Sequence, residues 1–140
     1  MKSDDQVLSA DITLTIPFHD VDPAQIVWHG HYAKYLELAR GRLLDKIDYN
    51  YAQMEQSGYF WPVIEMQLRY IAPIRFHQEI RVTAVLKEWE NRLLIDYLIT
   101  DAATGRRLTK ASTTQVAVSM SSGTMLLASP SVLLDKMRGT

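Results

Sequence analysis

One long helical stretch, followed by strands with no helix between them, is the feature that most limits how this chain can fold. From about His31 to Ile47, apolar residues recur at three- and four-residue spacing and would line one broad helix face. From Pro62 onwards, apolar and polar residues alternate in several segments. Strands without intervening helices disfavour a doubly wound parallel sheet. The pattern favours an α+β fold, a curled antiparallel sheet wrapped around one central helix, in a single domain over residues 1–140.

Alternation and turn residues predict where the strands lie. A first strand is predicted over 12–18, ended by Pro17 and the following Asp-Pro step. Later strands are predicted over 64–70, 80–87, 93–100 and 108–120, with a short helical turn over 51–56 and a strand or helical tail over 132–137. The sheet face opposite the helix also carries apolar residues, namely Val85, Leu94, Leu98 and Val116. Together with an open edge strand, these residues predict a homodimer.

The composition limits the chemistry and the compartment. The 140 residues contain no cysteine, which excludes disulfides, thiolate metal sites and cysteine nucleophiles. No apolar run approaches the roughly 18 residues of a membrane span, and the N-terminus lacks the apolar core of a signal peptide. We therefore expect no membrane span and a cytoplasmic location. The net charge of −1 gives no reason to expect a nucleic-acid partner.

The stretch from Phe18 to Tyr32 gathers two carboxylates and three histidines between the first strand and the helix. Asp22 is followed by the stiff Pro23, and the helix begins soon afterwards. A carboxylate near a helix N-terminus faces unpaired N–H groups, and the same groups stabilise an oxyanion formed on a carbonyl. This arrangement indicates acyl transfer with Asp22 as the active carboxylate. The alternative is that Asp22, like Asp20, only caps a turn.

The histidines allow a second interpretation. His29 and His31 flank Gly30 and could form a metal pair completed by Asp20 or Asp22. No other dense ligand cluster exists, so no metal is predicted. Gly30 permits a close backbone approach where the helix begins. Structural roles are expected for Asp20, His19 and His31.

Other acidic and aromatic residues have simpler interpretations. Glu37 with Arg40 or Arg42 predicts an ion-paired helix surface, and Glu65 is expected to face away from the core. Residues 59–61 are aromatic and either line a pocket or belong to the core. The chain contains no Gly-x-Ser-x-Gly, phosphate loop or Gly-x-Gly-x-x-Gly motif, which argues against serine hydrolases and nucleotide-binding proteins.

Residues 20–32, Asp-Val-Asp-Pro-Ala-Gln-Ile-Val-Trp-His-Gly-His-Tyr, are followed by Tyr35 and by Glu-x-Ala-Arg at 37–40. This stretch resembles the start of the 4-hydroxybenzoyl-CoA thioesterases and YbgC-type acyl-CoA thioesterases, and Lys-Glu-Trp at 87–89 resembles them too. The order of elements matches over nearly the whole chain. The resemblance implies a hotdog fold, acyl-CoA hydrolysis without a cofactor, and dimers or tetramers with sites between protomers.

By position, the resemblance implies site residues. Asp22 matches the catalytic aspartate, acting as nucleophile or general base, and His29 matches the residue whose backbone N–H polarises the thioester carbonyl. Gly30 and Tyr32 would contact the substrate. Gln25 departs from the family, which usually has glycine there.

A second departure concerns the thiol carrier. The basic run that holds CoA phosphates in the hydroxybenzoyl branch is reduced here to Glu90, Asn91 and Arg92. Arg92 is thus the predicted contact, and an acyl carrier protein is an alternative thioester donor. Two further hypotheses are a dehydratase that uses His29 with an acidic partner, and a non-catalytic acyl-ligand binding module.

Overall fold

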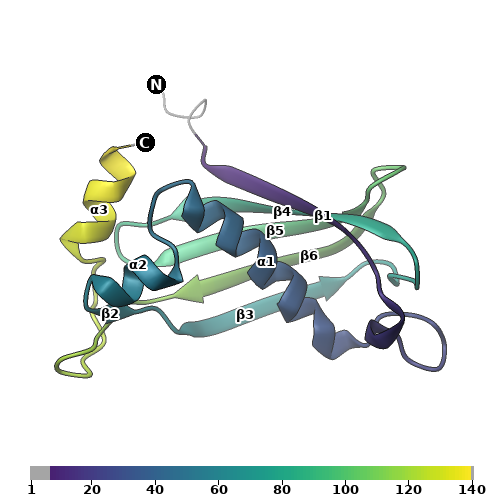
Figure 1. Cartoon of the computed structure of the whole chain (residues 1–140), viewed down its shortest axis with the longest axis horizontal. Helices are drawn as coiled ribbons and strands as arrows, with labels where there is room; N and C mark the ends of the chain where they lie inside the picture. Colours follow the sequence, from purple (N-terminus) through teal and green to yellow (C-terminus); the bar gives the residue numbers. More distant parts are fainter. Residues whose placement is uncertain (1–6, 140) are drawn as a thin grey trace.

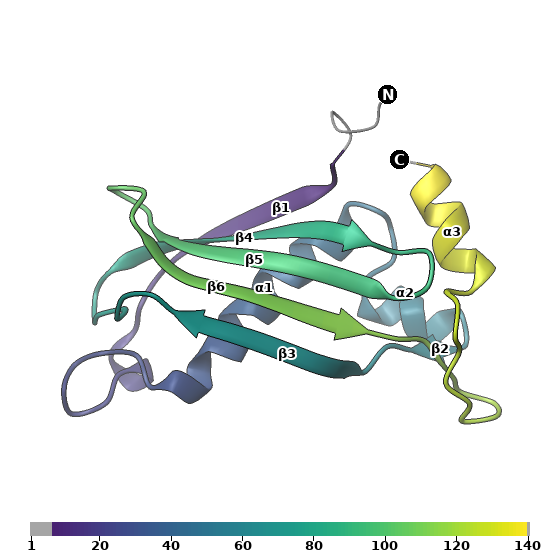
Figure 2. The ribbon, with the colours of Figure 1, turned by 180° about the vertical axis from the view of Figure 1, so that it is seen from behind.

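The computed structural model describes residues 7–139. Its centre is the helix α1 (Tyr32–Asp45), which crosses one face of a five-stranded sheet (Figure 1). The strand order is β1 (Ser9–Thr15), β4 (Glu79–Glu88), β5 (Leu93–Asp101), β6 (Arg107–Gln115) and β3 (Val63–Tyr70). All neighbouring strands are antiparallel. Seen from behind, the sheet lies in front of α1, and no described helix covers that outer face (Figure 2).

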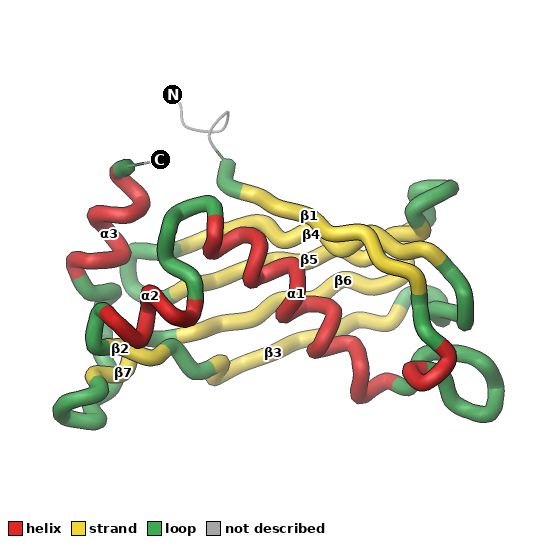
Figure 3. The backbone as a smooth tube through the Cα atoms, in the orientation of Figure 1, coloured by secondary structure: helices red, strands yellow, loops and turns green. Residues whose placement is uncertain are grey.

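Shorter elements flank this layer pair (Figure 3). The segment before α1 contains the 3₁₀ turns η2 (Phe18–Asp20) and η3 (His29–His31). The helix α2 (Tyr51–Gln56) begins with a capping box, and β2 (Tyr59–Phe60) pairs with β7 (Val118–Ser119). The chain ends in α3 (Ser131–Arg138). None of the helices described over residues 7–139 is long and apolar enough to cross a membrane.

The predicted apolar stripe of the helix forms the centre of the core. Tyr35, Leu36, Ala39 and Leu43 are buried against the sheet, and alternate residues of β4 and β5 meet them from the other side. Burying apolar surface contributes about 25 cal/mol per Å², so this interface is the main source of stability. The prediction of a curled antiparallel sheet around one long helix is therefore confirmed.

Some boundaries differ from the prediction. The first strand covers 9–15 rather than 12–18, because Pro17 turns the chain into η2 and leaves Phe18 exposed. The predicted strand over 108–120 is divided, since the chain leaves the large sheet after Gln115 and then pairs with β2. The tail over 132–137 is helical.

Glu37 was predicted to pair with Arg40 or Arg42 on the helix surface. The Glu37–Arg40 ion pair is present, but the surface location predicted for Arg40 is wrong. Its side chain is only 7 % exposed. Its Nε donates to the Tyr51 hydroxyl at 2.8 Å, and Nη1 donates to the Tyr97 hydroxyl at 3.4 Å. Glu37 is exposed, with its carboxylate 4.0 Å from Arg40 Nη2. Two phenol oxygens from distant segments thus replace water around the guanidinium.

Exposed apolar residues follow the β3 edge rather than the outer face. Val116 is buried, and Val85, Leu94 and Leu98 are half-buried. On the helix side of β3, Met66 and Tyr70 are about half exposed, at 45 % and 48 %, and Ile64, at the irregularity in the β3–β6 pairing, is 52 % exposed. No other described strand pairs with the free side of β3. The fold therefore leaves one open, apolar sheet edge.

Candidate active site

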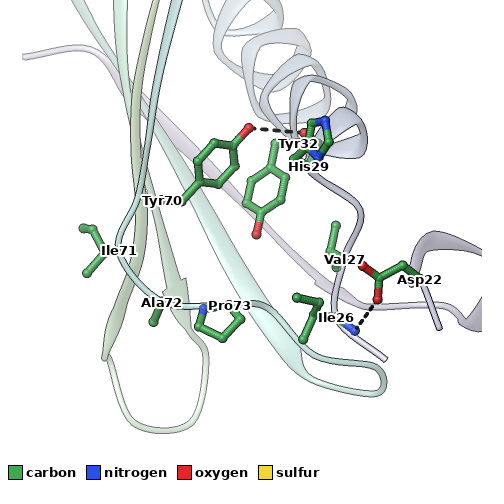
Figure 4. Close-up of a pocket in the computed structure, with 9 residues that line it drawn as sticks. All are labelled: Asp22, Ile26, Val27, His29, Tyr32, Tyr70, Ile71, Ala72 and Pro73. Atoms are coloured by element: carbon green, nitrogen blue, oxygen red, sulfur yellow. Dashed lines mark hydrogen bonds between the residues drawn. The ribbon is translucent and has the colours of Figure 1, made fainter. Parts of the chain in front are cut away.

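A hollow of about 330 Å³ lies beside the N-terminus of α1 (Figure 4). Its walls come from the loop before the helix and from the segment that follows β3. The lining residues are Asp22, Ile26, Val27, His29, Tyr32, Tyr70, Ile71, Ala72 and Pro73. The structure thus brings together Asp22, His29 and Tyr32, three of the residues predicted from sequence. The wall formed by residues 70–73 was not predicted, although a proline at a strand end is a signal for such a turn.

A tight loop orients the Asp22 carboxylate. Its Oδ1 accepts the backbone N–H of Ala24 at 2.9 Å and that of Ile26 at 3.4 Å. The Asp22 backbone N–H donates to the Ile26 carbonyl at 2.9 Å, which closes the loop. Gln25 has φ of 65°, the left-handed region that favours glycine. Gln25 therefore holds a backbone conformation that residues with a side chain rarely adopt.

Asp20 anchors the same loop to the helix. Its carboxylate is 1 % exposed and accepts the Lys34 Nζ–H at 2.7 Å and the Tyr35 hydroxyl at 2.6 Å. Its backbone carbonyl accepts the N–H of Trp28 at 3.1 Å. Burial raises the pKa of Asp20, but the hydrogen bonds from Lys34 and Tyr35 and the Lys34 charge outweigh it, so the pKa lies below 3.8. Asp20 is structural, as predicted, but as a buried anchor rather than a turn residue.

Gly30 lets an aromatic ring pack over the start of the helix. A Cβ atom at Gly30 would overlap the Trp28 ring, which also packs edge-on against His31. The N–H of His31 donates to the Trp28 carbonyl at 2.9 Å. The N–H groups of His29 and Gly30 precede this bond and, as the first of the helical segment, lack an intrahelical acceptor. Gly30 itself does not line the hollow.

Tyrosines join the two walls. The Tyr70 hydroxyl donates to the His29 carbonyl at 3.3 Å, and its ring meets the Tyr32 ring edge-on at 4.7 Å. Burial raises the pKa of the Tyr32 hydroxyl, so this group stays protonated at neutral pH. The end of β3 is therefore fixed against η3.

Arg92 lies away from the hollow. It is in the β4–β5 turn, at the opposite end of the sheet, and its Nε is 3.3 Å from Glu88 Oε1 (Figure 1). Within one chain the structure does not bring Arg92 to the other predicted site residues. Trp61, also at that end, is buried and donates its Nε1–H to the Tyr49 hydroxyl at 3.2 Å. In the part of the chain that is described, no group of histidines and carboxylates could hold a metal ion.

A curled antiparallel sheet around one central helix, with a carboxylate-bearing hollow at the helix N-terminus, defines a hotdog-fold protein. A family model described as the thioesterase-like superfamily matches residues 16–136, and the chain belongs to this superfamily. Its class is therefore thioester hydrolase.

Several similar proteins share most of the chain. A Synechocystis protein named "Putative esterase" is 29 % identical in an alignment of 136 positions that covers 89 % of this chain and 76 % of that protein. A hypothetical protein of Thermus thermophilus superposes with a TM-score of 0.82 at 26 % identity, over 93 % of this chain and 98 % of its own. The DHNA-CoA thioesterase of Staphylococcus aureus superposes with a TM-score of 0.78 at 22 % identity, over 85 % and 80 %. This last likeness shows the fold.

The Asp20 anchor predicts a pH-dependent loss of stability on substitution. Because its pKa is lowered on folding, the charged carboxylate stabilises the fold above pH 3.8, and this contribution is lost as the pH falls through the folded value. Asp20→Asn should lower the free energy of unfolding by about 1.5–3 kcal/mol at pH 7. Urea denaturation from pH 7 to 3 should show the difference from wild type shrinking below pH 4.

Asp11→Asn is the matched control. Asp11 is exposed and lies 3.9 Å from the Arg81 guanidinium, so its loss should cost less than about 0.5 kcal/mol at any pH. An Asp20→Asn effect that equals the Asp11→Asn effect, or one that does not change with pH, would contradict the anchoring role.

Proposed function

We propose that this protein hydrolyses acyl thioesters of coenzyme A to the free acid and the thiol. The observation that carries the proposal is the meeting of Asp22, His29 and Tyr32 around one hollow at the N-terminus of α1. Membership of the thioesterase-like superfamily supports it. The Staphylococcus aureus neighbour, named a CoA thioesterase, supports coenzyme A as the thiol carrier.

Asp22 provides the reactive oxygen. Two backbone N–H groups hold Oδ1, and no donor among residues 7–139 forms a hydrogen bond with Oδ2. In one route Oδ2 attacks the thioester carbonyl carbon, the C–S bond breaks, and water hydrolyses the resulting anhydride. In the other, Asp22 removes a proton from the attacking water, and the proton then passes to the departing thiolate.

The oxyanion formed in either route needs hydrogen-bond donors. The N–H of His29, at the first position of η3, is free of an intrahelical acceptor, and the positive end of the α1 dipole adds to it. The Tyr70 hydroxyl holds the His29 carbonyl and so limits rotation of that peptide. In this proposal the His29 side chain is secondary to its backbone.

A second copy of the chain would complete the enzyme. The open β3 edge and its half-exposed Ile64 and Met66 would pair with the same strand of a partner around a two-fold axis. Tyr70, at the end of β3, is part of the hollow, so this pairing would place the partner against the hollow. We propose a homodimer as the minimal unit.

Asp22→Asn should reduce kcat/KM for thioester hydrolysis by at least about 100-fold, because the reactive carboxylate is lost. The fold should survive, since the amide oxygen can accept the same two N–H groups. The measurement is thiol release from a panel of short, long and aromatic acyl-CoAs and acyl carrier protein thioesters, with Asp96→Asn on the outer face as control. If Asp22→Asn hydrolyses thioesters as fast as the wild type, the role assigned to Asp22 is ruled out. If the wild type binds acyl-CoA saturably but releases no thiol, the protein is a binding module.

His29→Pro and His29→Ala separate the backbone from the ring. Trp28 has φ −63° and ψ 135°, a conformation compatible with a following proline, and the first helical position tolerates proline. Proline removes the N–H and should lower kcat by about 100- to 1,000-fold, whereas alanine should cost much less. A large loss in His29→Ala with activity retained in Asp22→Asn would instead favour a dehydratase.

Met66→Glu should convert a dimer into monomers, because two buried like charges would face each other across the β3 edge. Light scattering after size-exclusion chromatography measures the mass. Thr83→Glu adds the same charge on the outer face of β4 and should leave the dimer intact. Dimers that persist in Met66→Glu would disprove pairing through β3.

A further inference from the structure

Arg75 lies at the rim of the hollow, next to two of its lining residues. It follows Pro73 by two residues, and the intervening Ile74 is fully buried. Because side chains in extended chain alternate between two sides, Arg75 points to the same side as Pro73 and away from the core. Arg75 is exposed, and its side chain therefore extends from the pocket wall towards solvent.

Pairing with the loop that carries Asp22 independently gives the same orientation for the Arg75 side chain. Arg75 forms an isolated antiparallel bridge with Ile26, which also lines the hollow. The flanking hydrogen bonds run from Val27 N–H to the Ile74 carbonyl at 2.7 Å and from Phe76 N–H to the Gln25 carbonyl at 3.1 Å. This pattern makes Ile26 and Arg75 a non-hydrogen-bonded pair, in which the two Cβ atoms are about 4.5–5.5 Å apart on one side of the ladder.

The Arg75 guanidinium is not neutralised by any residue that the structure describes. No carboxylate of residues 7–139 lies within ion-pair distance of it, whereas Arg92 faces Glu88 and Lys34 faces Asp20. The backbone of Arg75 is fixed, since its N–H donates to Gln78 Oε1 at 2.9 Å. An exposed guanidinium on a fixed backbone position thus lies close to Ile26 and Pro73, two residues that line the hollow.

We propose that Arg75 binds the phosphate at the end of the substrate's pantetheine arm. The inference rests on the proposed function, in which the thioester carbonyl lies beside Asp22. The arm then runs out of the hollow, and its phosphate lies outside, near the rim rather than near the carboxylate. A guanidinium pairs with phosphate oxygens in a bidentate manner. This phosphate is common to coenzyme A and to acyl carrier proteins.

The test compares one acyl group on four thiol carriers: pantetheine, 4′-phosphopantetheine, coenzyme A and an acyl carrier protein. Arg75→Gln should lower the ratio of kcat/KM for phosphopantetheine over pantetheine by about 10-fold or more, mainly through KM. A similar fall for coenzyme A and the carrier protein identifies the shared phosphate as the group recognised. A fall confined to coenzyme A or the carrier protein, with the phosphopantetheine ratio unchanged, overturns the proposal.

Arg107→Gln is the matched control. Arg107 is exposed and borders a hollow on the outer face of the sheet, so its loss makes the same change in net charge away from the site. In Arg107→Gln, the ratio of kcat/KM for the phosphopantetheine thioester over the pantetheine thioester should equal that of the wild type. Arg75→Lys should give an intermediate ratio, because lysine keeps the charge but loses the fork. Equal ratios in Arg75→Gln, Arg107→Gln and the wild type overturn the proposal.

A binding measurement keeps this inference separate from catalysis. Calorimetric titration of phosphopantetheine and pantetheine into the wild type and Arg75→Gln needs no thioester hydrolysis. If Arg75→Gln binds phosphopantetheine more weakly than the wild type does but binds pantetheine equally well, the contact is supported. If the wild type also hydrolyses none of the thioesters, the proposed function fails and the contact stands. Equal binding by both proteins overturns the contact.

Discussion

The buried carboxylate of Asp20 ties the loop that carries Asp22 to the helix α1. An ionised group without water is costly unless it is paired and hydrogen-bonded. Asp20 meets this requirement only where the loop places it against Lys34 and Tyr35 of α1. The same residue accepts the N–H of Trp28 through its backbone. The two ends of the segment that carries Asp22 are therefore joined to each other, and the Asp20 carboxylate joins them to the helix.

Asp20 and Asp22 thus have different environments, although only one residue separates them in the sequence. Asp20 is enclosed and neutralised by a cation, so its charge stabilises the fold and is unavailable to a substrate. Asp22 is half-buried at the hollow, and within residues 7–139 its carboxylate accepts hydrogen bonds from backbone N–H groups only. Paired carboxylates commonly divide their roles through such differences in surroundings. The strained Gln25 is part of the cost of turning Asp22 into this position.

Local patterns predicted the parts of the fold and site that depend on neighbours in sequence. The stripe along α1 was predictable because one helix face is buried. Asp22, His29 and Tyr32 were predicted together because they lie within eleven consecutive residues, 22–32, at the start of the helix. Arg40 was misplaced because the Tyr97 hydroxyl that solvates it comes from a strand 57 residues away. For the same reason the wall after β3 was missed, as was Arg75. Only the register between separate segments brings these residues to the loop.

The open β3 edge and the hollow are adjacent, because both include the end of β3. Tyr70 lines the hollow and ends β3, the strand whose helix side also exposes Met66, so the hollow lies beside the unpaired edge. Oxyanion stabilisation by fixed N–H groups is much stronger where water is excluded, because the local dielectric is lower. In the proposed dimer the partner covers this edge and narrows the access of water to the hollow. Arg75 follows residues 70–73 in the segment that connects β3 to β4. In this proposal the thiol carrier lies there and remains in solvent. Pairing of the chains and activation of Asp22 would then be consequences of the same contact.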